Sequence, residues 1–227
     1  MKNLLITCIC ALLAFPAGAS TRRVAAGDDL GRAIRTLKDN DTLVIAAGSY
    51  AVEGTLAVKR STVIAGEAGA RPRITVGSFR IGTGAEHLVL RGLDLTLGGK
   101  HLVDTPSEGS VEIGLIAIEN CTVDLGGSTG AGLVGSRTSG TARNRIGEIR
   151  VEDCVVFNGG FPQHFVYSAA STSQTAVGKI RLCDSTFADM ARGAVVTNAR
   201  MQTRIEIERC TFYDINRADN NAGTIRL

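Results

Sequence analysis

The chain has 227 residues, a net charge of +3 and 44% hydrophobic residues. This length suits one globular or solenoid unit and is enough to bury a core. Aromatic residues make up only 4% and glycine is abundant, which favours a core of stacked strands over a helical one. The mild basic excess lacks a basic stripe with interleaved aromatic residues, so nucleic acid is not an expected partner, whereas an anionic partner is compatible with it.

The first nineteen residues have the pattern of a signal peptide. Lys2 precedes the apolar run LLITCICALLAF, and the small residues AGA precede Ser20. We expect cleavage after Ala19, which leaves residues 20–227 as one domain that is secreted or periplasmic. The apolar run is too short for a confident membrane span, so no span is expected.

One amphipathic helix is expected next, in the segment AGDDLGRAIRTLKDN (residues 26–40). Asp28 can cap it, and Leu30, Ala33, Ile34 and Leu37 recur at the helical spacing. After Asn40 the chain reads as strands, such as DTLVIAAGSY and HLVLRGLDLTL, separated by Gly, Pro and Asn.

Two phrases then repeat with one common period. The first phrase is IENCTV at residues 118–123, with relatives LRGLDL, VEDCVV, LCDSTF and IERCTF; its fourth position is Leu93, Cys121, Cys154, Ser185 and Cys210, at spacings of 28, 33, 31 and 25. The second phrase has a column of Val103, Val134, Val166, Val196 and Ile225, at spacings of 31, 32, 30 and 29. A period near thirty built from strands predicts a parallel β-helix in which each repeat makes one coil.

The first phrase also predicts a bend and a ladder of thiols. The residues before the fourth position are Gly92, Asn120, Asp153, Asp184 and Arg209. All but Arg209 are types that tolerate left-handed backbone geometry. The cysteines that follow are expected to point inward as free, buried thiols. A disulfide between neighbours such as Cys121 and Cys154 is the alternative, a zinc site is disfavoured, and Cys183 is expected to face outward.

The second phrase predicts a groove. If the valine column faces inward, the next residues face outward: Asp104, Gly135, Tyr167, Thr197 and Arg226, with Asn198, Arg137 and Arg200 in or near the following turns. Such a ladder can bind an elongated saccharide; the alternative is a solvated face. The loop FNGGFPQHFVYS adds Gln163, His164 and Tyr167 as a sugar-stacking and acid–base set, against the alternative of a loop packed on the coil.

These elements together resemble a known group of enzymes. The helix with DTLVIAAGSY, the segment AGARPRITV and the phrases NCTV and RCTF resemble the chondroitinase-B-like polysaccharide lyases, polysaccharide lyase family six, which includes alginate lyases. The resemblance runs from about Val24 to the end. It implies an all-β, right-handed single-stranded parallel β-helix (a solenoid) with an N-terminal capping α-helix. It also implies β-elimination on a uronate-containing anionic polysaccharide, with calcium on the carboxylate, a lysine base and an arginine acid.

The family positions are only partly reproduced. In ARGAVVTNARMQT, Arg192 and Ala194 stand where the resemblance places two calcium-binding glutamates, and Ala199 stands at the lysine position. No metal ligand is therefore assigned and the cofactor stays unknown, with calcium implied by the resemblance alone. The catalytic candidates are Arg226, Arg200, Tyr167 and His164, and the substrate-binding candidates are Asp104, Arg137, Gln163, Thr197 and Asn198.

The expected function is that of an exported lyase, or lyase relative, acting on an anionic polysaccharide such as alginate. One alternative is a non-catalytic glycan-binding or envelope scaffold. Another is a truncated, inactive lyase, because the sequence stops at TIRL inside a predicted strand without a polar cap. An uncapped strand edge would also promote self-association.

Overall fold

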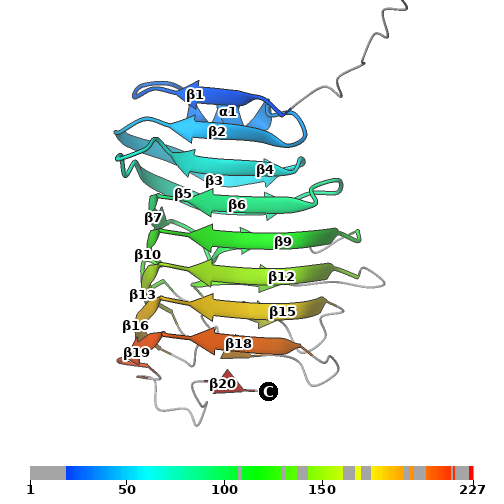
Figure 1. Cartoon of the computed structure of the whole chain (residues 1–227), viewed down its shortest axis with the longest axis vertical. Coiled ribbons are helices and arrows are strands. Elements are labelled where there is room, and N and C mark those ends of the chain that lie inside the picture. The colour runs from blue at the N-terminus through cyan, green and yellow to red at the C-terminus, as the bar shows by residue number, and fades with distance from the viewer. Residues whose placement is uncertain are drawn as a thin grey trace, which may run out of the picture.

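Figure 1 shows a computed structural model of the chain. It describes residues 19–106, 109–128, 131–136, 143–160, 175–191, 203–215 and 217, and the backbone alone of 167–169, 195–196 and 225–226. Across these ranges the regular structure is parallel strand apart from one short helix, so the fold is all-β. No helix within them is long and apolar enough to cross a membrane. The predicted signal peptide lies, except for Ala19, outside the described residues.

The first sheet stacks its strands in chain order, from β1 beside α1 to β18 near the C-terminal end (Figure 1). Its inward positions are aliphatic, and the register aligns Leu88, Ile116, Ile149 and Ile180, which are all fully buried. Burying such columns against the second sheet supplies the main stabilisation of the fold. The eight strands are β1 (Thr21–Val24), β2 (Asp41–Ile45), β4 (Thr62–Gly66), β6 (His87–Arg91), β9 (Glu112–Glu119), β12 (Arg145–Glu152), β15 (Ala176–Cys183) and β18 (Arg204–Glu208).

The second sheet has twelve strands and divides at β5 (Arg73–Ile81), which pairs with β3 (Ser49–Val58). The first half of β5 pairs with one series, the β7 arm, and the second half with another, the β8 arm. The β7 arm contains β7 (Asp94–Leu97), β10 (Thr122–Asp124), β13 (Val155–Gly159), β16 (Thr186–Met190) and β19 (Thr211–Tyr213). The β8 arm contains β8 (His101–Asp104), β11 (Gly132–Ser136), β14 (Tyr167–Ala169), β17 (Val195–Val196) and β20 (Ile225–Arg226).

From β6 onward each repeat therefore contributes one strand to the first sheet, one to the β7 arm and one to the β8 arm. In the two repeats before it, one long strand, β3 or β5, takes the place of the two arm strands. The register agrees with the alignment of the first phrase, since Ile118 pairs with Leu90 and with Val151, which in turn pairs with Leu182. Leu182 pairs with Ile207 in the last of these strands.

A short helix, α1 (Leu30–Arg35), packs against β3. Its N-cap is Asp29, whose carboxylate accepts a hydrogen bond from the Arg32 amide at 2.8 Å. Asp28, the expected cap, instead accepts from the Ala25 amide in the preceding turn. The helix is shorter than predicted because the Thr36 hydroxyl donates to the carbonyls of its last turn, while the backbone leaves the helical region there.

The bend predicted from the first phrase is confirmed at all five positions. Gly92, Asn120, Asp153, Asp184 and Arg209 have φ values of 64°, 49°, 53°, 49° and 51°. For arginine this backbone geometry costs about 1–2 kcal/mol. The side chain of Arg209 offsets part of that cost, because its guanidinium donates to both carboxylate oxygens of Asp184 one repeat earlier, at 2.5 and 2.7 Å.

The Asp184–Arg209 pair leads to a prediction about acid stability. Its hydrogen bonds hold the pKa of Asp184 well below the usual range. Because the folded-state pKa is depressed, the pair stabilises the fold above about pH 4 and loses this contribution as pH falls through the folded-state value. In the Arg209→Gln variant we expect the Asp184 pKa to rise toward 3.8. Carboxyl NMR titration checks this, and an unchanged Asp184 titration in the variant would contradict the pairing.

The residues after the bend form the predicted inward column. Four members of this column are buried, namely Leu93, Cys121, Cys154 and Ser185. Cys210, between β18 and β19, is half-buried. The four cysteines of residues 121–210 are free thiols, and the Cys121 amide donates to the Cys154 sulfur at 3.4 Å.

Cys183 departs from the prediction. It does stand in an outward register column, between Glu152 and Glu208, but it is only 1% exposed. Arg209 and Asp184 cover it, each with a side-chain atom 3.1 Å from the sulfur. Contacts from the adjacent Asp184 and from Arg209 in the following repeat thus bury a side chain that alternation alone would place in solvent.

This burial reverses the order of thiol reactivity that alternation implies. We expect native alkylation to modify Cys210 first and to spare Cys121, Cys154 and Cys183. The hydrogen bond to Asp184, together with burial, also raises the pKa of Cys183 and lowers its thiolate fraction. Mass spectrometry after timed alkylation measures this order.

Arg209→Ala should expose Cys183 and raise its alkylation rate at least severalfold. Arg204→Ala is the matched control. It removes an exposed arginine from β18, the strand that ends just before Arg209, and Arg204 has no contact with this sulfur. Rapid labelling of Cys183 in the unmodified protein would show that the cover is not present in solution.

Candidate functional site

The predicted groove would lie on the outer face of the β8 arm. One register column there starts at Ala57 and continues through Arg80, Asp104, Gly135 and Ser168. Val196 and Arg226 pair at its far end. We call these seven residues the outer column. Five strand steps separate Arg80 from Arg226, so at the usual strand spacing the column is about 24 Å long between them.

The register corrects two of the predicted outward positions. Tyr167 pairs with Val134 and with Val195, so it belongs to the column of the buried Val103 and Val134. Ser168 takes the place expected for Tyr167, and Val196 takes that of Thr197. The error is a slip of one residue, which exchanges the two faces of a strand. The segments FVYSA and VVTNA permit it, because each has adjacent large or β-branched residues that fit either register.

Asp104 stands in the outer column as predicted and is held by a histidine that the sequence did not suggest. Its carboxylate lies 3.3 Å from Nδ1 of His101, with side-chain exposures of 26% and 4% respectively. The imidazole packs over Gly135, where a Cβ would lie 2.1–2.4 Å from three ring atoms. Nε2 of His101 is buried and makes no hydrogen bond within the described structure.

This pair limits the chemistry available on this face. Nδ1 of His101 faces the Asp104 carboxylate, so Nε2 is the ring nitrogen left to act on a ligand. However, that atom is shielded from solvent, and a general base must come within hydrogen-bond reach of the proton it removes. His101 is therefore placed to orient Asp104, and it does not reach a sugar bound on the surface.

A buried network of polar side chains lies just after β8, where the chain turns away from the outer column. The Asn144 amide donates to the Thr105 hydroxyl at 3.0 Å and to the Pro106 carbonyl at 3.1 Å, and its oxygen accepts from the Val111 amide at 3.1 Å. Thr105 also donates to Ser136 in the next repeat. This network fixes the direction in which the chain leaves the outer column for the next strand of the first sheet.

Most of the other predicted residues lie outside the described part of the chain. These are Arg137, Gln163, His164, Thr197, Asn198 and Arg200. Arg226 is described by its backbone alone, at the end of the outer column in β20.

The described residues offer no binding site for the calcium that the resemblance implies. Among them, no group of three or more His, Cys, Asp or Glu side chains is arranged to hold a metal ion. The positions that the resemblance assigns to the calcium ligands and to the lysine, at 192, 194 and 199, are not described. No step is therefore derived through calcium.

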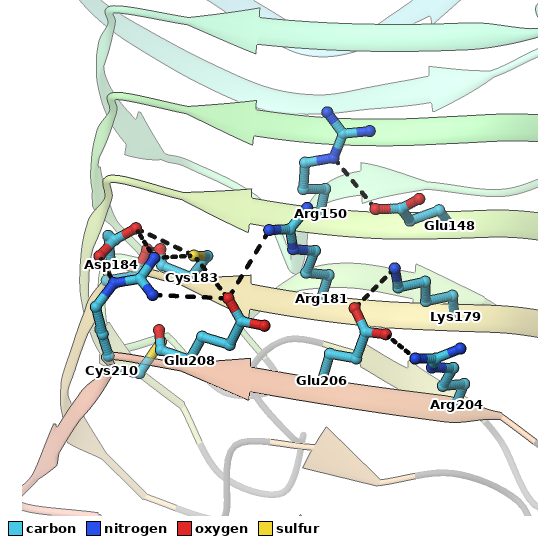
Figure 2. Close-up of polar contacts among 12 residues, drawn as sticks. Glu148, Arg150, Lys179, Arg181, Cys183, Asp184, Arg204, Glu206, Glu208 and Cys210 are labelled. Carbon is cyan, nitrogen blue, oxygen red and sulfur yellow. Dashed lines mark hydrogen bonds and ion pairs between the residues drawn. The ribbon is translucent and has the colours of Figure 1, made fainter.

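The outer face of the first sheet differs from that of the β8 arm in its charge. Its acidic and basic side chains neutralise one another, both within a strand and between neighbouring strands (Figure 2). Lys179 and Arg204 each lie 2.7 Å from Glu206, and Arg150 lies 3.2 Å from Glu148. By contrast, Arg80 in the outer column is exposed and forms no ion pair with a described residue.

Two residues of this site, Arg80 and His101, escaped the sequence reasoning. His101 opens the phrase HLVDT, three residues before Asp104, so its spacing was a usable signal. Arg80 could not be recognised from the repeat, because the second phrase begins only with β8. Arg80 lies before it, in β5, which pairs with strands of both arms.

Comparisons with known proteins show the same fold at low identity. No family model and no curated protein matches the chain. A solved structure of the PL6 family alginate lyase AlyGC, as an arginine-to-alanine mutant, matches 92% of the chain with a TM-score of 0.51 and 14% identity. Another structure of AlyGC matches 94% with a TM-score of 0.49 and 14% identity. The chain spans 30% and 39% of these two chains.

This likeness shows a fold similar to that of a polysaccharide lyase, and it does not single out chondroitinase B. It is distant, since only 14% of the aligned residues are identical.

Proposed function

We propose that this chain is an exported, right-handed single-stranded parallel β-helix that binds a uronate-containing anionic polysaccharide such as alginate. The parallel three-strand repeats and the likeness to AlyGC support the fold. The packing of α1 against β3 supports a capping role for the helix at the first repeat. The predicted signal peptide supports a secreted or periplasmic location.

The observation that carries the binding proposal is the exposed Arg80 in the outer column. An arginine fork matches a carboxylate bidentately, and Arg80 has no partner among the described residues that would compete for it. At about 24 Å between Arg80 and Arg226 the column is long enough for several sugar units, and a second arginine, Arg226, stands at its far end. Asp104 stands between them, so its carboxylate repels a uronate and keeps the affinity low.

The same site is poorly equipped to cleave the polysaccharide, so we expect slow cleavage or none. Elimination requires a base at the sugar and neutralisation of the uronate carboxylate. Arg80 can supply the second requirement, but arginine stays protonated and is a poor base. Two bases lie at this part of the column: the free nitrogen of His101 is shielded, and the carboxylate of Asp104 repels the uronate carboxylate. The chain is therefore a glycan-binding relative of the lyases in this proposal.

Alginate binding is expected to weaken as salt rises and to weaken about two- to fivefold in Arg80→Gln, the effect of losing about 0.5–1 kcal/mol from one exposed ion pair. Titration calorimetry at low and high salt measures both effects. Arg73→Gln is the matched control, because Arg73 is an exposed arginine of the same strand whose register partner, Asp94, lies in the β7 arm.

Ultraviolet absorbance of the unsaturated product tests cleavage, with alginate and with chondroitin, in the presence and absence of calcium. Rapid calcium-dependent cleavage would contradict the non-catalytic proposal. Equal losses in Arg73→Gln and Arg80→Gln would contradict the assignment of the outer column. No binding to either polymer would favour the scaffold alternative.

A further inference from the structure

A cavity of about 260 Å³ lies between α1 and the connection from β3 to β4. Its apolar lining is formed by the buried side chains of Ile34, Leu37 and Val58. Three exposed cations complete the lining, namely Arg35, Lys59 and Arg60. None of the three forms an ion pair with a described residue, and the described residues that line the cavity include no carboxylate.

The cavity opens at the N-terminal end of the outer column. Ala57 lines it, and Ala57 is the register partner of Arg80. Lys59 follows two residues later and approaches the next turn, where a Cβ at Gly82 would lie 3.2 Å from its Cγ. Among the described strands β3 pairs with β5 alone, and α1 packs against β3. A linear polymer that follows the outer column toward the N-terminus therefore meets α1 and the cavity.

We propose that this cavity binds the terminal uronate unit of the polysaccharide chain. This inference rests on the proposed function, because it takes the polymer to lie along the outer column. The cavity is smaller than the 300–1,000 Å³ or so that is typical of drug-sized ligands, which suits a single sugar ring. The three cations match one carboxylate, and the aliphatic lining matches the C–H face of a pyranose ring.

A chain-end site predicts that a single uronate binds without the rest of the polymer. We expect glucuronate to shift the methyl NMR signals of Ile34, Leu37 and Val58 in the full chain. In Arg35→Gln and in Arg60→Gln, the glucuronate affinity should fall at least fivefold, and that of an alginate trisaccharide should fall likewise. Binding of long alginate should change less, because most of its contacts would lie along the outer column.

Arg32→Gln is the matched control, since it removes the same charge from the same helix at an exposed position that does not line this cavity. Equal glucuronate affinity in Arg32→Gln, Arg35→Gln and Arg60→Gln would overturn the inference. If long alginate binds while glucuronate leaves the three methyl signals unmoved, the chain-end site is wrong and the proposed function stands. If long alginate does not bind to any of the proteins, the proposed function fails instead.

Discussion

Gly135→Ala is expected to destabilise the protein by about 3 kcal/mol, at the upper end of the usual cost of overpacking a core. The added Cβ would lie 2.1 Å from Nδ1, 2.3 Å from Cγ and 2.4 Å from Cε1 of His101. The ring is rigid and buried, so it must leave its place, and the contact with Asp104 is then lost. Urea unfolding followed by circular dichroism measures the change in the free energy of unfolding.

A double-mutant cycle separates this clash with His101 from any other cost of adding a side chain to β11 at position 135. In a His101→Ala background, Gly135→Ala should cost less than about 1 kcal/mol, because the ring that it strikes is absent. Gly98→Ala is a control at an ordinary distance, since its Cβ would lie 3.7 Å from the nearest atom, the Val76 carbonyl oxygen. Equal costs of Gly135→Ala in both backgrounds would show that His101 does not occupy the space over Gly135.

Asn144→Ala is expected to cost about 2–4 kcal/mol, because it removes three hydrogen bonds in a site that is 2% exposed. The buried Val111 amide would be left without its acceptor, and an unsatisfied buried group costs about 1–3 kcal/mol. Urea unfolding at neutral pH measures this loss.

Asn144→Asp tests the direction of these bonds. The new side chain can still accept from the Val111 amide, but it can donate toward Thr105 or Pro106 only when protonated. Burial raises the pKa of such a carboxyl, so the variant should be more stable at acidic pH than at neutral pH. Asn40→Asp is the control, because Asn40 is exposed and keeps its positive φ with aspartate. A loss independent of pH would contradict the assigned orientation of the amide.

The sequence alone was sufficient to predict the all-β class, the repeats of the first sheet and the left-handed bends at Gly92, Asn120, Asp153 and Asp184; the bend at Arg209 followed only from its place in the repeat. These features depend on short-range rules, since alternation decides which residues face inward and only certain residue types favour positive φ. Cys121 and Cys154 could be placed inside for the same reason. Asp104 followed from the second phrase, whose first two members, Val103 and Val134, are in register as expected.

Only the tertiary structure decided features that depend on contacts between repeats. Gly135 and His101 meet because parallel stacking brings together residues that the sequence separates by a whole repeat. Cys183 is buried by Arg209 of the following repeat, against its own alternation. The slip at Tyr167 was invisible because two registers fit the local pattern equally well. The cavity beside Ala57 exists because α1 packs on β3. Neither segment has a sequence pattern that indicates contact with the other, because local periodicity does not encode side-chain packing between distant segments.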